Sequence, residues 1–445
     1  MSIKISETTE YNIKKLSISS KVGEYDLSGM FDELNIFDSL LNPCMSGNIL
    51  IKDAIGLLEK IYLDGSEFIN VQITKSRNDS LDEITSFDKS FRVYKISDRN
   101  PNSMTSESYI LHFMSEEYIY SEQQKVEQSF EGNYHQMASI VLAKYLKVPI
   151  AEKRVGYIEK TRGLHSIVVP NLSPFDTINW LARRSINESG SPDFMFFQNK
   201  TGYNFISLST MLQQQPLFRV NFSPKNLVNE VSNELFGATS VKILSQFNLP
   251  ETIKNGMYAG RFVGFDTLTR KIQIKEINFL DMYNKSNHAN KYPNVNVSKN
   301  KDGKDASSMY KSKIVVYPFQ SARANNTWTK ENDPKTATLI DDTDNYVYQR
   351  KAIIYNLLQT RVQLTLPGNF VLSSGFNLQL DFPPRNAGGQ VDGVDDALNG
   401  KYIIIAARHM FKQNKHETVL EVATDSTNRP MYRADDSSIN NSRNL

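Results

Sequence analysis

The feature that most constrains the fold is a series of short segments in which apolar and polar residues alternate. In the first part of the chain these segments lie at Ile49–Ile51, Val71–Ile73, Phe91–Ile96 and Tyr109–Met114. Alternation with a period of two puts successive side chains on opposite faces of a β-strand, so each segment has one face to bury. Glycine, asparagine, aspartate and proline between the segments favour turns. We therefore predict a β-rich domain of barrel type over residues 12–120.

A second group of alternating segments lies near the other end of the chain, at Val362–Leu366, Asn377–Phe382, Tyr402–Phe411 and Glu417–Ala423. If the last two segments pair around Gln413–Asn414, Phe411 opposes His416 and His409 opposes Thr418. One face of this hairpin then collects six apolar residues, Ile403, Ile405, Ala407, Phe411, Leu420 and Val422. In the same register Arg408 is diagonal to Glu417 and Glu421.

Three further strands are predicted at Ser240–Leu244, Tyr258–Val263 and Arg270–Ile277, and an amphipathic helix between Tyr346 and Leu358. Between them, residues 281–313 are rich in asparagine, lysine and serine and poor in large apolar side chains. Such a segment cannot bury enough surface to offset the entropy lost on ordering. We therefore expect a long loop or a mobile excursion here, in an insertion that splits the second β domain, and we predict that residues 285–335 are dispensable for folding but not for assembly.

The clearest helix start lies in the middle of the chain. Ser173 fits the N-cap, Pro174 fits the first helical position, and Asp176 places a carboxylate near the positive end of the helix dipole. A helix is predicted to begin here, followed by a hairpin that turns at Asn199–Gly202. Another helix is predicted over residues 134–148.

The amino-acid sequence of this central helix resembles that of a known protein family. Pro174–Ser185, which reads Pro-Phe-Asp-Thr-Ile-Asn-Trp-Leu-Ala-Arg-Arg-Ser, resembles the central baseplate hub protein of contractile-tailed bacteriophages. Ser46–Ala54 together with Phe68–Ile73 resembles the first barrel of that family, and the strands from Val362 to Ala423 resemble its second, tube-like barrel. Residues 285–335 lie outside the resemblance.

The resemblance implies an α+β, predominantly β fold with two tail-tube-like β-barrel domains, a helix/hairpin domain and an insertion. The corresponding domain map has a first tube-like β-barrel at 1–125, an α/β hub domain at 126–225, a second tube-like β-barrel at 226–260 and 345–430, an insertion with a mobile loop at 261–344, and a flexible C-terminal tail at 431–445.

A hub protein of this family is implied to form a homotrimeric ring. Its two barrels per chain would match the sixfold tail tube protein on one side, and the ring would accept a trimeric central spike protein on the other. Surrounding baseplate wedge proteins would be further partners, and DNA would pass only in transit through the channel. The resemblance places the chain in the tail baseplate of the virion, assembled in the host cytoplasm, with a structural role and no cofactor.

The composition of the chain excludes several classes of protein and of binding site. The chain has 445 residues, and its 51 basic and 49 acidic residues leave a net charge of +2, too balanced for a general nucleic-acid binder. Cys44 is the only cysteine, so an intrachain disulfide and a cysteine-rich zinc site are excluded. No apolar run approaches ~18 residues, and the first ten residues lack a signal-peptide core, so we expect neither a membrane span nor secretion by that route.

The strong catalytic motifs are absent from the sequence, including the nucleophile elbow, the P-loop and the zinc-protease helix. His409 and His416 would lie at a diagonal separation of about 7–8 Å, which is long for two ligands of one metal, so we interpret them as barrel-edge histidines. The acidic loop Gly393–Gly400 offers oxygens to a calcium ion but does not fit the EF-hand spacing, which favours a plain surface loop. We predict no catalytic residue and no metal site.

The candidate interaction residues are aromatic or charged. Trp180 is interpreted as a core or subunit-contact anchor. Arg183 and Arg184 either pair with carboxylates of a neighbouring subunit or form a solvated helix face. Trp328 lies in a polar stretch and is a candidate contact residue. The remaining candidates are Arg385, Asp392, Asp395 and Asp396.

Two other functions remain open from the residues alone. A cell-wall-degrading tail enzyme would need two carboxylates about 5–10 Å apart across a cleft. A receptor- or carbohydrate-binding module would display exposed aromatic side chains, for which Trp328 and Tyr317 are the candidates.

Overall fold

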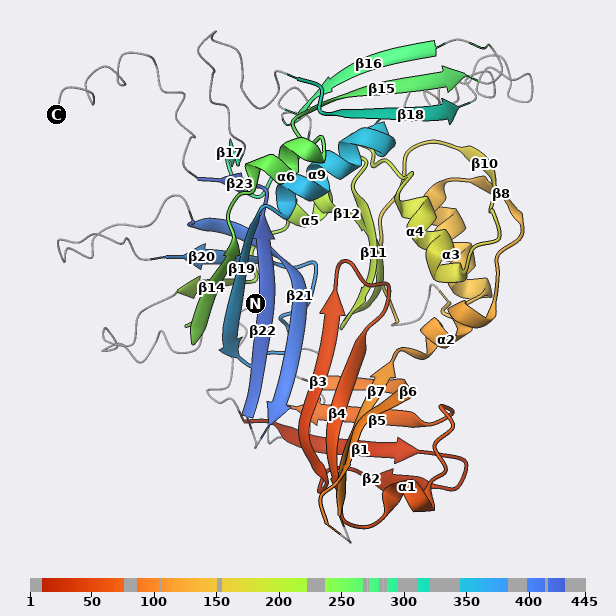
Figure 1. Ribbon diagram of the computed structural model, residues 1–445, viewed down its shortest axis with the longest axis vertical. Helices are drawn as coiled ribbons and strands as arrows, with labels where there is room; N and C mark the ends of the chain where they lie inside the picture. Colours follow the sequence, from red (N-terminus) through yellow and green to blue (C-terminus); the bar gives the residue numbers. More distant parts are fainter. Residues whose placement is uncertain are drawn as a thin grey trace, which may run out of the picture.

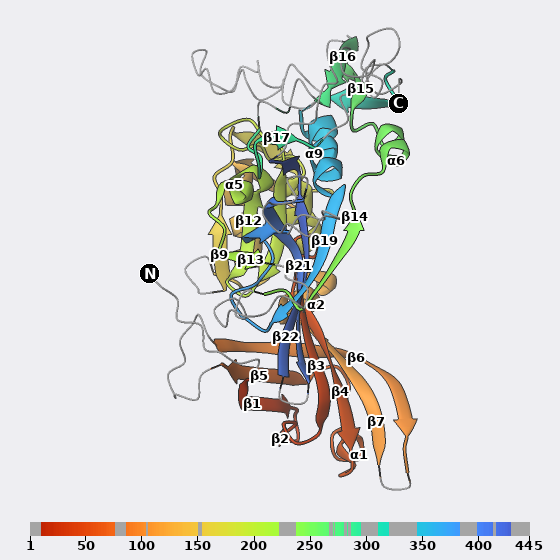
Figure 2. The same ribbon diagram turned by 90° about the vertical axis from the view of Figure 1, so that its left-hand side faces the viewer.

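The computed structural model confirms a predominantly β, α+β fold built around one large sheet (Figure 1). It describes residues 10–75, 86–103, 106–149, 154–221, 237–266, 270, 272–279, 283, 286–294, 310–319, 345–382, 398–412 and 415–428. The strands nearest the N-terminus lie at one end of the long axis, and a small three-stranded sheet lies at the other (Figures 1 and 2).

Seven strands form the N-terminal β unit: β1 (Asn12–Ser19), β2 (Glu24–Asp26), β3 (Phe31–Ser39), β4 (Ser46–Asp53), β5 (Phe68–Thr74), β6 (Ser86–Pro101) and β7 (Glu107–Met114). The short helix α1 (Leu57–Lys60) connects β4 to β5. The predicted alternation holds, because Ile49 and Ile51 on β4 and Leu111 and Phe113 on β7 are all fully buried in one core.

Six strands form the C-terminal β unit: β13 (Phe218–Asn221), β14 (Ser240–Ser245), β19 (Thr360–Pro367), β20 (Asn377–Asp381), β21 (Gly400–Lys412) and β22 (Lys415–Thr424). Strand β21 joins the two units. Its first residues pair with β20 as far as Ile403, and from Ala406 it pairs with β3 of the N-terminal unit instead. The strands expected in two separate barrels therefore form one continuous sheet, and the described residues include no strand pair that closes either half into a barrel.

The predicted hairpin register is confirmed at both histidines, since Phe411 pairs with His416 and His409 with Thr418. The predicted apolar face is wrong at its start. A register shift between Ile404 and Ala406 turns the strand, so Ile403 and Ile405 pack in a different core from Leu420 and Val422.

The expected diagonal position of Arg408 is confirmed, since Arg408 pairs with Val419 between Glu417 and Glu421, but its ion pair is made on the other side of the strand. The Arg408 guanidinium lies 3.0 Å from Glu33 on the neighbouring strand β3, and Glu421 pairs with Arg361 at 3.1 Å. The sequence pattern of a single hairpin does not reveal which strands flank it, so it cannot assign such cross-strand partners.

The helix–hairpin unit lies beside the large sheet and contains α2 (Glu116–Gln123), β8 (Ser129–Gly132), α3 (Tyr134–Lys144), β9 (Val155–Ile158), β10 (His165–Val168), α4 (Pro174–Ala182), β11 (Phe194–Asn199), β12 (Gly202–Ser207) and α5 (Leu208–Gln213). Helix α4 begins as predicted, with the Ser173 hydroxyl accepting a hydrogen bond from the Asp176 N–H at 3.2 Å. The β11–β12 hairpin turns where predicted, and Gly202 takes the positive φ of 124° that favours glycine. Helix α3 ends at Lys144, before the predicted end.

A third part of the chain forms the insertion sheet, made of β15 (Ala259–Asp266), β16 (Ile272–Asn278) and β18 (Lys313–Phe319). The elements around it are α6 (Leu249–Lys254), β17 (Tyr292–Pro293), η4 (Asn345–Gln349), α9 (Arg350–Leu357) and β23 (Ser426–Thr427). One face of the insertion sheet packs on η4, where Phe262, Ile277 and Tyr348 share a small core.

The expectation of a mobile loop over residues 281–313 is wrong for two described stretches. Strand β18 begins at Lys313 and runs parallel to β15, and β17 pairs with β23 at the end of the large sheet. The expectation relied on the low apolar content of this region. It did not take into account that asparagine and histidine side chains can hydrogen-bond buried polar groups and so hold a segment in place.

Candidate functional site

A cleft with a volume of about 920 Å³ lies between the N-terminal β unit and the helix–hairpin unit. At its base the Lys89 ammonium donates a hydrogen bond to the Asn199 carbonyl oxygen at 3.0 Å. Burial lowers the pKa of Lys89 to about 8, and the nearby Glu117 and Asp38 carboxylates oppose that shift. A buried amine with these neighbours is an internal link between units.

Asp38 extends this link into the C-terminal β unit. Its carboxylate accepts hydrogen bonds from the Ser373 hydroxyl at 2.6 Å and from the Ser374 N–H at 2.8 Å. Burial raises the pKa of Asp38 to about 6, although these hydrogen bonds favour the charged form. Asp38 lies on β3 and the two serines lie between β19 and β20. Their hydrogen bonds therefore connect the two β units beside the strand β21 that the units share.

The cleft carboxylates are engaged within the fold. Glu117 lies 3.0 Å from the Arg154 guanidinium and accepts a hydrogen bond from the Tyr203 hydroxyl at 3.2 Å. Glu116 accepts from the Tyr120 hydroxyl at 2.6 Å and lies 3.6 Å from Arg92. Carboxylates held in this way position neighbouring elements, and their arrangement does not resemble an acid and a base aimed at a substrate.

A second cleft is lined by two of the predicted interaction residues, Arg183 and Arg184. This α4–α9 cleft has a volume of about 620 Å³ and is lined by side chains from α4, β11, β18, η4 and α9. Arg183 is exposed at its rim, and Arg184 stacks on Trp180 with the guanidinium carbon 4.0 Å from the ring centroid. Trp180 is half-buried and packs on the core of the helix–hairpin unit, while the two arginines at the end of α4 face the cleft.

The other predicted interaction residues, Trp328, Arg385, Asp392, Asp395 and Asp396, lie outside the described residues.

The outer face of the insertion sheet is apolar and exposed. Cross-strand neighbours share this face, because Val263 on β15 pairs with Ile274 on β16 and with Val316 on β18. Ile274 is 62% exposed and Val316 is 69% exposed. A contiguous exposed apolar face of this kind is typical of a protein interface. The sequence pattern did not reveal it because β18 is separated from the β15–β16 hairpin by a long stretch of the chain.

The two C-terminal histidines are core residues and not barrel-edge residues. His409 and His416 are buried, and Nδ1 of His409 lies 3.2 Å from Nε2 of His416. Phe370 and Phe411 pack on the His416 ring at centroid distances of 4.7 and 4.3 Å. The expected separation of about 7–8 Å was wrong because it took a Cβ spacing for the distance between two rings that lean toward each other.

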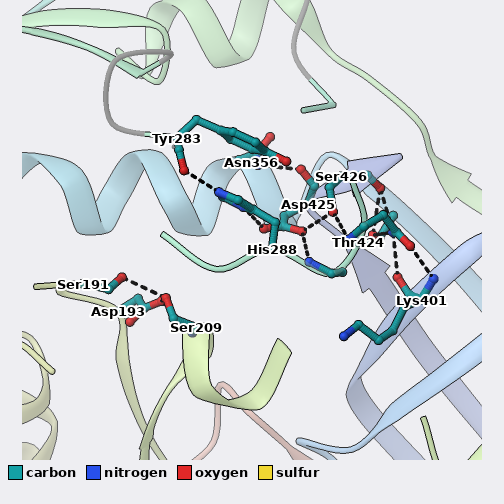
Figure 3. A network of polar contacts seen from close by, with 12 residues as sticks. Ser191, Asp193, Ser209, Tyr283, His288, Asn356, Lys401, Thr424, Asp425 and Ser426 are labelled. Atoms are coloured by element: carbon teal, nitrogen blue, oxygen red, sulfur yellow. Dashed lines mark hydrogen bonds and ion pairs between the residues drawn. The ribbon is translucent and has the colours of Figure 1, made fainter. Parts of the chain in front are cut away.

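A polar network holds the stretch 286–294 against the end of the large sheet (Figure 3). His288 Nδ1 lies 2.7 Å from Asp425, whose second carboxylate oxygen accepts a hydrogen bond from the Ala289 N–H at 3.0 Å. The Asn290 amide donates to the Lys401 carbonyl oxygen and to the Thr424 hydroxyl, and its oxygen accepts from the Lys401 N–H.

The surroundings of His288 in this network change its pKa. Burial is the largest single effect and lowers the pKa of His288. The hydrogen bond and charge of Asp425, the Tyr283 carbonyl oxygen and the charge of Asp193 together outweigh burial, so the pKa of this imidazole is raised. The imidazole also stacks on Tyr283, with ring centroids 3.5 Å apart. This network was not predicted from the sequence. Its polar residues lie on two segments far apart in the chain, His288 and Asn290 on one and Thr424, Asp425 and Ser426 on the other.

The described residues contain no group of three histidine, cysteine, aspartate or glutamate side chains placed to hold a metal ion. The Cys44 thiol is buried, and burial raises its pKa to about 12, which disfavours a reactive thiolate. Of the helices that the structure describes, none is long and apolar enough to cross a membrane.

Comparison with known proteins shows a similarity that extends over most of the chain. No protein-family model matches the sequence. The chain is 20% identical over 408 residues to the probable baseplate hub protein of Vibrio phage KVP40, a match that covers 88% of this chain and 89% of that protein. The chain is related to phage baseplate hub proteins.

The solved structures give the fold. The tail protein from Neisseria meningitidis MC58 matches with a TM-score of 0.53 and 11% identity, covering 94% of this chain and 97% of that protein. The 43 kDa tail protein of prophage MuSo2 from Shewanella oneidensis has a TM-score of 0.47 and 8% identity over 93% of this chain and 100% of that protein. The hub-related chain thus shares the fold of the Neisseria tail protein over nearly its whole length.

Proposed function

We propose that three copies of this chain form the central ring of a phage baseplate, which joins the tail tube to the central spike and lines the channel for genome passage. The observation that carries the proposal is the similarity to a probable baseplate hub protein, which extends over 88% of this chain and 89% of that relative. A similarity of that extent favours a shared role for the whole chain over the sharing of one module.

The architecture fits such a ring. Each chain carries two β units in one continuous sheet, so three chains would present six β units to a sixfold tube. The Asp38 link and the shared strand β21 fix the two units relative to each other, which a ring of constant diameter requires. The near-neutral net charge of +2 suits a wall past which DNA moves without binding.

In this proposal the protein works as a structural component of the virion tail baseplate, after assembly in the host cytoplasm. Its partners are the trimeric spike protein, the tail tube protein and the surrounding baseplate wedge proteins. No catalytic activity belongs to the role. A turbidity assay on purified cell walls should show no clearing by the chain, and clearing would favour a cell-wall-degrading enzyme instead.

The proposal is tested by mass photometry of the purified chain, alone and mixed with the spike protein encoded by the same phage. We expect particles of three chains, either free or in a complex with the spike. A chain that stays monomeric and binds neither the spike nor the tube protein would contradict the proposal.

A further inference from the structure

The α4–α9 cleft combines apolar walls with positive charge. Leu41, Phe196 and Val315 contribute apolar surface, and Leu41 is 58% exposed at the rim. Four cationic side chains, Arg183, Arg184, Arg350 and Lys351, line the same space, and no carboxylate is among its described lining residues.

The fold only partly compensates the cations of this cleft. Arg350 donates hydrogen bonds to the backbone carbonyl oxygens of Pro192 and Phe194, which are uncharged acceptors. The nearby Asp193 carboxylate does not line the cleft, and it accepts hydrogen bonds from the Ser209 N–H at 2.8 Å and hydroxyl at 2.6 Å. Burial lowers the pKa of Arg350 to about 10, the nearby Asp193 carboxylate opposes this shift, and Arg183 adds an unfavourable like charge. The fold therefore concentrates positive charge here at a cost in free energy.

We propose that the α4–α9 cleft binds an acidic segment of another protein, in which carboxylates flank at least one apolar side chain. The four cations would pair with the carboxylates, and the walls formed by Leu41, Phe196 and Val315 would take the apolar side chain. A nucleic-acid backbone fits less well, because phosphates and sugars gain nothing from aliphatic walls. The inference goes beyond the proposed ring, because it concerns a site within a single chain.

The test selects ligands from a random dodecapeptide library displayed on phage, with the full-length chain as bait. Enriched peptides should carry net negative charge and at least one large apolar residue. Their affinity should fall by at least about tenfold in the charge-reversed variant Arg183→Glu/Lys351→Glu, and also on raising the salt from about 0.05 M to about 0.3 M. Both substituted residues are exposed, so thermal unfolding should not change.

The matched control is Lys125→Glu/Lys160→Glu, which makes the same charge change at two exposed lysines outside the cleft. It should bind the selected peptides as the unchanged chain does. A third variant, Leu41→Ala, should also weaken binding, because it removes part of the apolar wall. Equal binding by the charge-reversed variant and the control would overturn the proposal.

Two other ligands of the cleft, DNA and a second copy of this chain, would give different results in these experiments. If a labelled DNA duplex binds in a manner abolished by Arg183→Glu/Lys351→Glu, and no acidic peptide is enriched, the cleft is a nucleic-acid site and the proposal fails. If the same variant instead reduces the chain from its oligomer to monomers in mass photometry, the cleft is a contact between copies of this chain. An unchanged oligomer with lost peptide binding supports the proposal.

Discussion

At the scale of single residues, the buried histidine pair makes the fold sensitive to acid. Burial, with the nearby Lys200 and Lys75, lowers the pKa of His409 to about 3, and burial lowers that of His416 well below its usual value. An unfolded histidine binds a proton near pH 6.5, so the unfolded chain takes up protons that the folded pair does not. These residues therefore contribute stability above about pH 6.5, and this contribution is lost as the pH falls from there toward about 3.

Replacing both residues, His409→Leu and His416→Leu, should make the fold less sensitive to acid. Removing both rings together leaves neither imidazole without its partner. The slope of the unfolding free energy against pH, between about pH 6.5 and pH 4, should become shallower by up to about 1.4 kcal/mol per pH unit for each histidine removed. Urea unfolding at several pH values measures the slope, with curves at about pH 8 as the reference. An unchanged slope would mean that other groups govern acid unfolding.

Asn290 is the residue whose side chain holds the 286–294 stretch most directly. Its amide bonds Lys401, Thr424 and Ser426, so Asn290→Ala leaves several buried polar groups unpaired. We expect a loss of about 2–4 kcal/mol in the free energy of unfolding, measured by urea denaturation. The control Asn42→Ala removes an exposed amide from a turn and should change the stability little. Equal stability of the two variants would restore the view that this stretch is dispensable.

At the scale of elements, the N-cap of α4 is a local signal that can be tested alone. The Ser173 hydroxyl accepts from the Asp176 N–H and also donates to the Asp176 carboxylate at 2.7 Å. Replacing both by alanine should cost about 1–2 kcal/mol, because the cap and a favourable dipole partner are lost together. Differential scanning calorimetry would detect the loss, and an unchanged transition would show that packing alone fixes the start of this helix.

The elements that could be predicted from the sequence are those with a local cause. The cap at Ser173, the turn at Gly202 and the strand alternation each depend on neighbouring residues, and each is confirmed. The register shift after Ile404 and the pairing of β21 with β3 depend on strands far away in the chain, so no local pattern contains them.

The candidate site follows the same division. The arginines at the end of α4 could be proposed as interaction residues from the sequence because they follow a helix with a clear start, and this stays a prediction. Their cationic partners Arg350 and Lys351 lie on α9, more than a hundred residues later, and only the fold brings them to the same cleft.

At the scale of the whole molecule, the described units form one elongated body with the insertion sheet at one end (Figure 2). This sheet carries an exposed apolar face. That face is the outer side of the insertion sheet, where Ile272, Ile274, Ile314 and Val316 are all more than half exposed. Its inner side packs on η4, so the sheet is already held on one side and its outer side is available to another molecule. In the proposed ring, we expect this face to contact a second copy of the chain.

The double substitution Ile274→Asp/Val316→Asp should therefore weaken self-association without unfolding the chain. Both side chains are exposed in the single chain, so the charges cost little there, whereas in an interface they would be buried without partners. We expect the concentration for half-assembly to rise by at least about tenfold in sedimentation velocity runs, with an unchanged thermal transition. The control Val22→Asp places the same charge at an isolated valine that is 68% exposed, and its assembly should be normal. If the double variant assembles like the control, the ring is built from other surfaces and the insertion sheet faces solvent or a different partner.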